Sequence, residues 1–263
     1  MKLNDKDHDT LAQRLVKASQ SGQGMTPPSE TLDFDLEDSW HIRRKFVDIL
    51  IGQGATPIGH KIGFTSEAMR EMYGMAAPDF GILLDNMVVP ADTPIPISGR
   101  CDTRAEPEIA FVLAKDLTGP RVTRADVMAA TDYVCAAIEV IDSRVGALRA
   151  KANDSLADNA GAGIVILGDV KLPPSALDLS SLQMTMTHQG TDQCAPAGDV
   201  MGHPAEPLAW LANKLTALDG LGGTLRAGDV IITGTPLKSV PVAAGEVLAA
   251  DFGPLGRLDL GFC

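Results

Sequence analysis

The chain has 263 residues, of which 45% are hydrophobic and 21% are charged. This is the composition of a globular protein long enough to bury a sizeable core, and it excludes a disordered tail, a collagen-like repeat and a coiled coil. Lysine and arginine number 22 against 34 aspartates and glutamates, which gives a formal net charge of −12. Nucleic acids and anionic membrane surfaces attract basic proteins, so neither is an expected partner. An anionic small molecule can still bind if its site holds a cation.

The cysteines and the first residues indicate the compartment. The four cysteines lie far apart and form no C-x-x-C pair, so neither a disulfide framework nor a zinc site is indicated. The first nine residues are rich in charged side chains and contain no apolar segment of the kind that a signal peptide needs. No run approaches the roughly 18 apolar residues that would predict a membrane span. We therefore expect a cytoplasmic protein.

Two helices are predicted at the start of the chain. Residues 7–21 repeat apolar side chains at helical spacing, and Gly22 can end this helix. A linker with two prolines follows at 24–30. Asp35 is then a suitable N-cap for a second helix that runs to about Ile51.

The chain changes character after residue 55. Short apolar or alternating runs, separated by Gly, Pro and Asp, predict strands. Strands that do not alternate strictly with helices are typical of an α+β fold. We therefore expect a helical N-terminal segment, 1–55, packed on a strand-dominated domain, 56–263. The predicted strands cover residues 58–64, 82–89, 106–114, 134–142, 163–168, 184–187, 230–233, 247–252 and 257–262.

Short helices are expected between these strands. One is capped at residue 65 or 66 and ends at Met72. Thr123, with Asp126 three residues later, has the spacing of a capping box. Pro204 suits the first turn of a third helix, which carries leucines at helical spacing.

A pair of glutamates is the first feature with chemical meaning. Glu106 and Glu108 are separated by one residue on a predicted strand, so their side chains point the same way. Two neighbouring carboxylates repel each other, and an apolar strand is a costly place for them. A divalent cation would relieve the repulsion, and oxygen ligands favour Mg²⁺, Mn²⁺ or Ca²⁺ over zinc. The alternative is that both side chains face solvent at the edge of a strand.

A third glutamate lies in a run that is otherwise apolar. Glu139 follows Ala136, Ala137 and Ile138, and a lone buried carboxylate needs a partner. One possibility is a salt bridge with Arg104 or Arg144. The other is that Glu139 is a third ligand of the same cation.

Lys61 is a candidate for proton transfer, and Asp79 is a candidate for a further carboxylate in the same site. Lys61 lies between Gly59 and Gly63, and glycines allow close approach of a ligand to the backbone. A partly buried lysine near a metal is expected to have a lowered pKa, although Lys61 could also be an ordinary surface lysine. Asp79, in the sequence PDFG, either caps a turn or directs its carboxylate into the same site.

These residues belong to an ordered set of motifs that resembles a known family. The set is similar to the hydratase/decarboxylase family of aromatic meta-cleavage pathways, within the fumarylacetoacetate-hydrolase-like superfamily. The resemblance covers nearly the whole chain. The motifs are GHKIGFTS at 59–66, PDFG at 78–81, RAEPEIA at 104–110, EVIDSR at 139–144, ADNA at 157–160, GHP at 202–204 and GDVIITG at 228–234.

The sequence departs from the family pattern at two places. Pro107 stands between the paired glutamates, where members usually have an aliphatic residue. Proline lacks a ladder donor, so an edge or a bulge is expected there. The TGTP sequence at 233–236 looks more like the wider superfamily than like the hydratases.

The resemblance implies a fold and a site. The implied fold is a mixed β-roll of the fumarylacetoacetate hydrolase C-terminal type, with the helical N-terminal segment beside it. The implied metal ligands are Glu106, Glu108 and Glu139, with Mg²⁺ or Mn²⁺ as the ion, and the implied catalytic residues are Lys61 and Asp79. The substrate-binding residues would be Thr233, Gly234 and Asp158, the first two through backbone amides, although Asp158 is equally well explained by a structural turn.

The implied reaction is the hydration of a small anionic 2-hydroxydienoate. Water would add to 2-hydroxypenta-2,4-dienoate to give 4-hydroxy-2-oxopentanoate through a metal-stabilised enolate. The alternatives within the family are decarboxylation of 2-oxohex-3-enedioate and hydration of 2-oxohept-4-ene-1,7-dioate. Members of this kind form homo-oligomers, and a pathway decarboxylase is a further possible partner.

Two functions of other classes are alternatives to hydration. Hydrolysis of a C–C bond in acylpyruvates would need a water-activating His–Glu arrangement near the metal. His60 does not suit it, because His60 is adjacent to Lys61 on a strand and should point away from it. A protein that only binds a metal or ligand on this scaffold is the other possibility.

Overall fold

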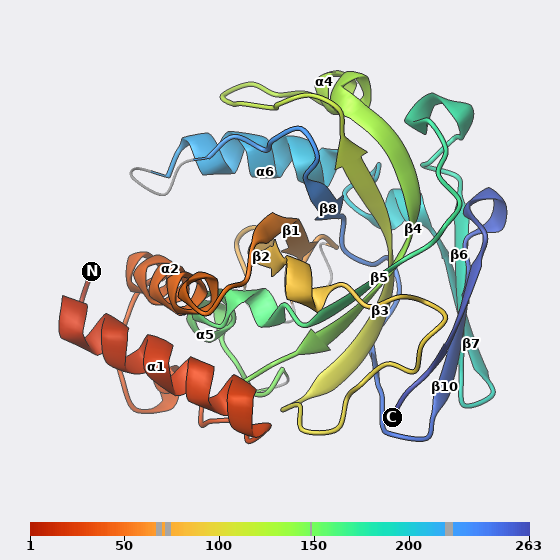
Figure 1. Ribbon diagram of the computed structural model, residues 1–263. Helices are drawn as coiled ribbons and strands as arrows, with labels where there is room; N and C mark the ends of the chain where they lie inside the picture. The colour runs from red at the N-terminus through yellow and green to blue at the C-terminus, as the bar shows by residue number, and fades with distance from the viewer. Residues whose placement is uncertain (67–69, 72–74, 148, 219–222) are drawn as a thin grey trace.

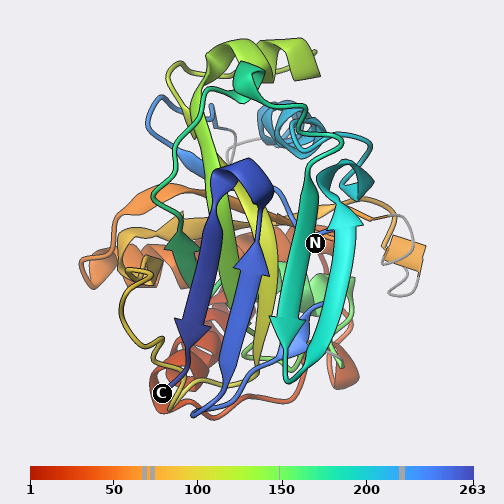
Figure 2. The same cartoon turned by 90° about the vertical axis from the view of Figure 1, so that its right-hand side faces the viewer.

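Two β-sheets form the body of the molecule (Figures 1 and 2). The computed structural model describes residues 1–66, 70–71, 75–147, 149–218 and 223–263. The larger sheet has the strand order β2-β1-β8-β3-β4-β5, and β9 pairs with β3. It is a mixed sheet, because β1 and β8 run parallel whereas the other pairs are antiparallel. Its strands are β1 (Pro57–Gly63), β2 (Asp79–Leu84), β3 (Thr103–Leu113), β4 (Thr131–Asp142), β5 (Ile164–Leu167), β8 (Val230–Ile232) and β9 (Val240–Pro241).

The smaller sheet is antiparallel and covers one side of the larger one (Figure 2). Its order is β11-β10-β6-β7. The main core fills the space between the two sheets and a helix, and it includes Phe111, Phe252 and Leu211. The strands of this sheet are β6 (Gln183–His188), β7 (Thr191–Pro196), β10 (Val247–Asp251) and β11 (Arg257–Gly261).

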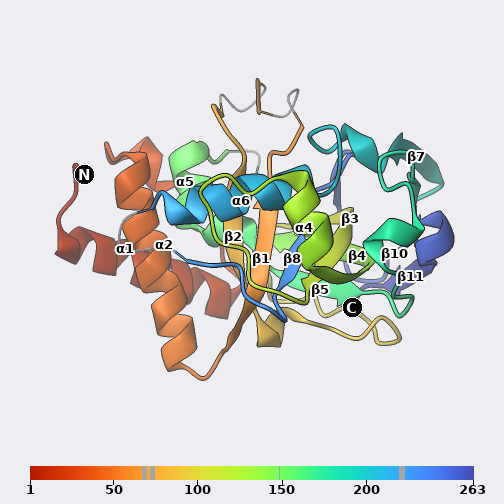
Figure 3. The same ribbon diagram turned by 90° about the horizontal axis from the view of Figure 1, so that it is seen from above.

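Helices lie around the larger sheet (Figures 1 and 3). The two helices predicted at the start of the chain are present and run side by side, and Asp35 caps the second with a capping box, as expected. They share a core cluster with residues of β2 and α5, including Phe46, Leu84 and Ala157. The predicted α+β class is thus confirmed. The helices are α1 (Asp5–Ser21), α2 (Leu36–Gly52), α4 (Arg124–Ala130), α5 (Ala152–Ala157) and α6 (Glu206–Thr216).

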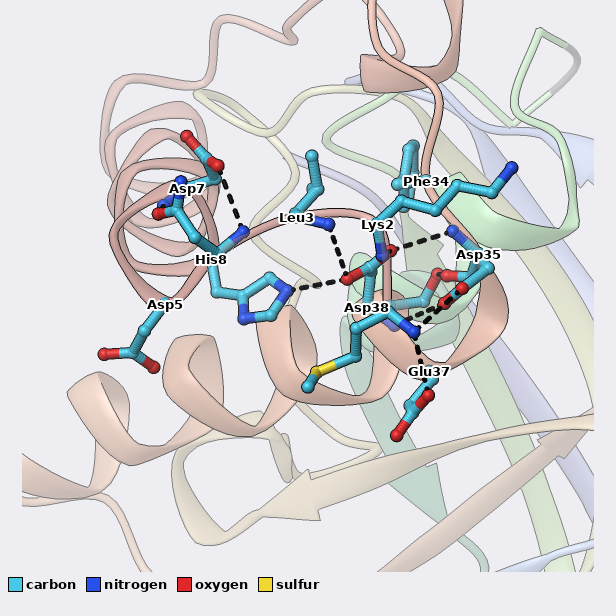
Figure 4. A network of polar contacts seen from close by, with 12 residues as sticks. Lys2, Leu3, Asp5, Asp7, His8, Phe34, Asp35, Glu37 and Asp38 are labelled. Atoms are coloured by element: carbon cyan, nitrogen blue, oxygen red, sulfur yellow. Dashed lines mark hydrogen bonds and ion pairs between the residues drawn. The ribbon is translucent and has the colours of Figure 1, made fainter.

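The start of α2 is fixed by a network around one buried carboxylate, shown in Figure 4. Asp38 is fully buried and accepts hydrogen bonds from the backbone N–H groups of Lys2, Leu3 and Asp35. Its Oδ1 also lies 3.0 Å from His8 Nε2 on α1. These bonds lower the pKa of Asp38 although burial alone would raise it. The two helices are therefore joined by polar contacts as well as by packing.

Several predicted boundaries differ from the structure. β2 begins at Asp79, three residues before the predicted strand, and is followed by a 3₁₀ turn at Asp85–Met87. β7 was not predicted because its sequence, TDQCAP, is polar and the strand lies at the exposed edge of its sheet. The helix expected from Pro204 begins at Glu206. The helix expected between residue 65 or 66 and Met72 falls largely outside the described residues.

Pro107 lies at a local edge, the first of the two expected alternatives, and no bulge interrupts the strand there. β3 pairs with β4 without interruption through Pro107 and Ile138. On its other flank β3 pairs with β9 at Arg104 and Ala105 and with β8 at residues 110–112. Pro107 falls between these two partners, where its missing N–H leaves no gap in a ladder.

None of the helices in the described part of the chain has both the length and the apolar character needed to cross a bilayer.

Candidate functional site

Three glutamates meet on the larger sheet. Glu106 of β3 pairs directly with Glu139 of β4, and Glu108 lies two residues further along β3 on the same face. One carboxylate oxygen from each lies within 4.8 Å of the others. Like charges directly opposite each other on neighbouring strands are destabilising, and here both Glu108 and Glu139 are fully buried. The arrangement therefore calls for a positive charge.

The hydrogen bonds of these carboxylates leave oxygens unused. Gly234 N–H donates to Glu108 Oε2 at 2.6 Å, but neither Glu108 Oε1 nor Glu139 Oε1 has a hydrogen-bond partner in the described part of the chain. Buried polar atoms are normally satisfied. Burial, reinforced by the neighbouring carboxylates, raises the pKa of Glu108 well above its ordinary value. Unpaired, oxygen-only donors at this spacing fit a hard divalent cation.

Lys61 supplies part of the missing charge. Its Nζ lies 3.1 Å from Glu139 Oε2 and donates to the carbonyl oxygen of Ala160 at 3.1 Å. Burial by itself would lower the pKa of Lys61, but the three carboxylates outweigh burial and raise the pKa above its ordinary value. The lysine is thus held as an ammonium. The lowered pKa expected for a lysine beside a bound metal ion stays a prediction.

Neither of the two arginines considered as a partner forms a salt bridge with Glu139. Arg144 pairs with Asp158 at 2.6 Å, and Arg104 donates to the hydroxyl and the carbonyl of Ser239. The partner of Glu139 is Lys61.

A turn with left-handed backbone presents the Ala160 carbonyl to Lys61. Asn159 and Ala160 have φ values of 54° and 53°, a conformation that few non-glycine residues adopt. The Asn159 side chain holds this turn against β2, because its amide accepts from the N–H of Ile82 and donates to the C=O of Ile82. Gly81, which pairs with Lys61 across the sheet, leaves room for the turn.

Replacing Gly81 by alanine should therefore disturb the site. The added Cβ would lie 2.3 Å from the carbonyl oxygen of Asn159 and 3.2 Å from Lys61 Cγ. We expect a loss of about 1–3 kcal/mol in the free energy of unfolding, as for other overpacked positions, together with a fall in kcat. Chemical denaturation and steady-state kinetics measure both. Gly52→Ala is the control, because its Cβ meets nothing within 4 Å, and equal losses in both variants would contradict the explanation.

Asp79 lies at the start of β2 and pairs with Gly63, two residues along β1 from Lys61. It is 4% exposed, its Oδ1 accepts from Phe80 N–H at 2.6 Å, and its Oδ2 accepts from Ser155 Oγ at 3.1 Å. Burial raises the pKa of Asp79 above its ordinary value, and the charges of Arg43 and Lys61 oppose that rise.

A cavity of about 530 Å³ reaches one of the three glutamates, Glu106. Lys61, Glu106, Asp158 and Gly234 are among its lining residues. Glu108, Glu139, Asp79 and Thr233 are buried and do not line it. Much of the remaining wall is apolar and includes Phe64, Met75, Ile141, Pro236 and Leu237. A small molecule with one polar end and an apolar body suits this shape.

The three residues predicted to bind substrate are already engaged within the protein. Both carboxylate oxygens of Asp158 accept from Arg144, one from the side chain and one from the backbone N–H. The Thr233 hydroxyl donates to the Gly234 carbonyl, and the Gly234 N–H is used by Glu108. Gly234 has φ of 83°, and a Cβ there would lie 2.5 Å from Thr65 Oγ1. A role for these residues toward substrate stays a prediction.

His60 lies on the opposite face of β1 from Lys61, as predicted. It lines a different cavity, with Trp40 and Arg43, and its ring centroid is 6.1 Å from that of Phe80. The structure thus offers no histidine beside the three carboxylates among the residues that it describes.

The protonation of Glu106 gives a test of the cation site. Burial raises the pKa of Glu106 to about 7 from a usual value of 4.5, so the folded chain holds this proton more tightly than the unfolded chain. The stability that this proton contributes is present below about pH 4.5 and is lost as pH rises through 7. A divalent ion competes with the proton. We expect the rise in Tm caused by Mg²⁺ or Mn²⁺ to grow between pH 5 and pH 8, and a rise independent of pH would argue against this site.

Sequence reasoning missed three contributors to the site. Ser155 bonds to Asp79, the Ala160 carbonyl bonds to Lys61, and Arg43 reaches the backbone beside Asp79. The backbone carbonyl has no signature in the sequence. Arg43 does have a signature in the sequence, because it shares a helix face with Trp40 and Val47, where a charged side chain is unexpected.

Comparison with known proteins adds relatives along the whole chain. Residues 59–261 match the model of the fumarylacetoacetate (FAA) hydrolase C-terminal family. The chain is 39% identical over 242 residues to a 2-hydroxyhexa-2,4-dienoate hydratase from Comamonas testosteroni, with 90% of each chain covered. It is 41% identical over 208 residues to a 2-hydroxypent-2,4-dienoate hydratase from Pseudomonas putida, with 78% of this chain and 94% of the relative covered.

A solved structure has the same fold throughout. The 4-oxalocrotonate decarboxylase from Pseudomonas putida G7, complexed with magnesium and adipate, matches with a TM-score of 0.93 and 28% identity over 99% of both chains. The predicted mixed β-roll with a helical N-terminal segment is thereby confirmed.

Proposed function

Because the chain belongs to the FAA hydrolase C-terminal family, we propose that it is a divalent-metal-dependent hydratase acting on 2-hydroxypenta-2,4-dienoate. The observation that carries this proposal is the convergence of Glu106, Glu108 and Glu139 beside a buried lysine. The two hydratase relatives, which carry the names of dienoate hydratases, support the substrate class. The proposed ion is Mg²⁺ or Mn²⁺, held by the three glutamates; magnesium is present in the decarboxylase complex.

The reaction divides into proton transfers and the addition of water. Ketonisation moves a proton from the 2-hydroxyl to C5, and the resulting enone takes the oxygen of water at C4 and a proton at C3, giving 4-hydroxy-2-oxopentanoate. A bound divalent ion supplies positive charge where the carboxylate and the 2-oxygen of the substrate gather negative charge. The protein must supply the groups that move protons.

Lys61 and Asp79 are assigned these proton transfers. Lys61 Nζ is buried, lines the cavity and holds a proton between Glu139 and the Ala160 carbonyl, so it is placed to give a proton to the substrate. Asp79 is connected to the cavity wall through the hydroxyl of Ser155 and is assigned the orientation of the attacking water. The apolar wall formed by Ile141 and Leu237 would exclude other water from the reacting carbons.

The direct test is an assay with 2-hydroxypenta-2,4-dienoate and added Mg²⁺ or Mn²⁺. Loss of the conjugated chromophore is followed by absorbance, and the product is identified by NMR. Metal-dependent formation of 4-hydroxy-2-oxopentanoate is expected. Metal binding without turnover would overturn the hydratase proposal.

Decarboxylation of 2-oxohex-3-enedioate is the second candidate. It is favoured by the likeness to a decarboxylase that binds adipate, a dicarboxylate, and by Lys151 and Lys238, which line the cavity. Neither lysine has an ion-pair partner within the described part of the chain, so either could meet a second carboxylate. Release of CO₂ from the enedioate, with no hydration of the monoacid, would establish this function instead.

The proposal has two further parts. Residues 56–263 are proposed to carry the metal site and residues 1–55 to support it. The protein is also proposed to act as a homo-oligomer, which light scattering can test. A pathway decarboxylase is the further partner proposed.

A further inference from the structure

A buried arginine lies behind the site, on the helical segment. Arg43 of α2 is 5% exposed and forms no ion pair among the described residues. Its guanidinium carbon lies 4.4 Å from the ring centroid of Trp40 and 4.2 Å from that of Phe80. Rings stabilise a cation only in part, and a buried charge without a partner of opposite sign is costly. A compensating negative charge is therefore expected nearby.

The hydrogen bonds of Arg43 lead to Asp79. Arg43 Nη1 donates to the carbonyl oxygen of Phe80 at 2.7 Å, and the N–H of the same Phe80 donates to Asp79 Oδ1 at 2.6 Å. Asp79 is buried as well and has no ion-pair partner within 4 Å in the part of the chain that the structure describes. Two buried charges of opposite sign thus flank the backbone of a single residue.

The electrostatics agree with this geometry. Burial raises the pKa of Asp79, and Arg43 opposes that rise more strongly than Lys61 does. The other groups that face Asp79 are the Ser155 hydroxyl of α5 and the Phe80 N–H. His60 of β1 lines the same cavity as Arg43. It adds no charge near neutral pH, because burial lowers the pKa of His60 to about 4.

The helix that carries Arg43 is held firmly. Asp38 lies five residues earlier on α2. It accepts hydrogen bonds from the backbone N–H groups of Lys2, Leu3 and Asp35 and lies 3.0 Å from His8 Nε2 of α1. Trp40 and Phe80 then pack their rings 5.0 Å apart around the guanidinium. Arg43 consequently has little freedom to move away from Phe80.

We propose that Arg43 is a positioning residue for Asp79: it anchors the Phe80 backbone and supplies the buried positive charge that balances the Asp79 carboxylate. The helical segment thereby takes part in the site without touching the cavity that Lys61 lines. This inference rests on the proposed function, in which Asp79 acts on the attacking water.

Two substitutions separate the charge of Arg43 from its hydrogen bond. Arg43→Gln keeps a donor and removes the charge, whereas Arg43→Lys keeps the charge. For Arg43→Gln we expect kcat to fall about 10- to 100-fold, with KM and Mn²⁺ affinity within about twofold of the wild type, and with the acid limb of the kcat–pH profile moved to higher pH. Arg43→Lys should recover most of kcat. The control is Arg44→Gln, the exposed neighbour on α2, which should retain wild-type kinetics.

A second measurement does not depend on turnover. The Tm values of Arg43→Gln, Asp79→Asn and the double variant form a double-mutant cycle. Each single variant leaves one buried charge without its partner, so the double variant should lose less Tm than the sum of the two single losses. Additive losses, or unchanged kcat in a folded Arg43→Gln protein, would overturn the proposal. Absence of wild-type turnover with a non-additive cycle would overturn the proposed function and leave the coupling of Arg43 to Asp79 intact.

Discussion

Replacing Glu108 by glutamine is expected to abolish tight divalent-metal binding and to lower kcat by at least about 10²–10³-fold. The substitution removes one of three converging carboxylates and keeps the side-chain volume. The metal-free protein should nevertheless become more stable, because Glu108 is fully buried beside two other carboxylates and one of its oxygens has no partner. We expect Tm to rise by at least about 2 °C, the shift that roughly 1 kcal/mol produces in a large domain.

Calorimetry with and without Mn²⁺ measures both effects. The wild type should gain Tm on addition of the ion, and Glu108→Gln should not. Glu71→Gln is the matched control, because it makes the same chemical change at an exposed position. A Glu108→Gln protein that is less stable without metal than the wild type would show that the carboxylate is satisfied, contrary to this description of the site.

Replacing Lys61 by methionine should produce the opposite pattern. The metal site keeps all three carboxylates, so the ion still binds, whereas kcat falls about 10²–10⁴-fold because the proton donor is lost. The metal-free protein should lose about 3–5 kcal/mol in the free energy of unfolding, since Glu139 loses the ammonium that lies 3.1 Å away. Added Mg²⁺ should restore much of that loss, because the ion replaces the missing positive charge.

Titration with Mn²⁺ and denaturation in chelator and in excess metal measure these changes. Lys115→Met, at an exposed position, is the control. A Lys61→Met protein that turns over the dienoate at the wild-type rate would remove Lys61 from the mechanism and favour a protein that only binds its ligand. Loss of metal binding in this variant would mean that the lysine supports the ligands rather than the chemistry.

The metal cluster could be predicted from the sequence because its chemistry is local. The alternation of a strand places Glu106 and Glu108 on one face, and an isolated glutamate in an apolar run requires a partner, which marks Glu139. The sequence left open whether that partner was an arginine or the shared cation. Only the pairing of β3 with β4, which places Glu139 opposite Glu106, brings the three together.

Other features depend on contacts that the sequence does not encode locally. The carboxylates that raise the pKa of Lys61 are brought together by strand pairing, which the residues next to Lys61 do not reveal. Both carboxylate oxygens of Asp158 accept from Arg144, a pairing that the sequence did not predict. Arg43 and Asp79 are 36 residues apart and meet only through the Phe80 backbone.

The pairing of β3 with β4 also limits how the chain can change in evolution. Side chains alternate between the two faces, so a slip of one residue between these strands would send Glu106 and Glu108 to the face opposite Glu139. Every insertion or deletion within either strand therefore carries the risk of dismantling the cluster at a single step. The connection between them, which contains α4 and lies away from the cavity, is free of this constraint and can vary in length.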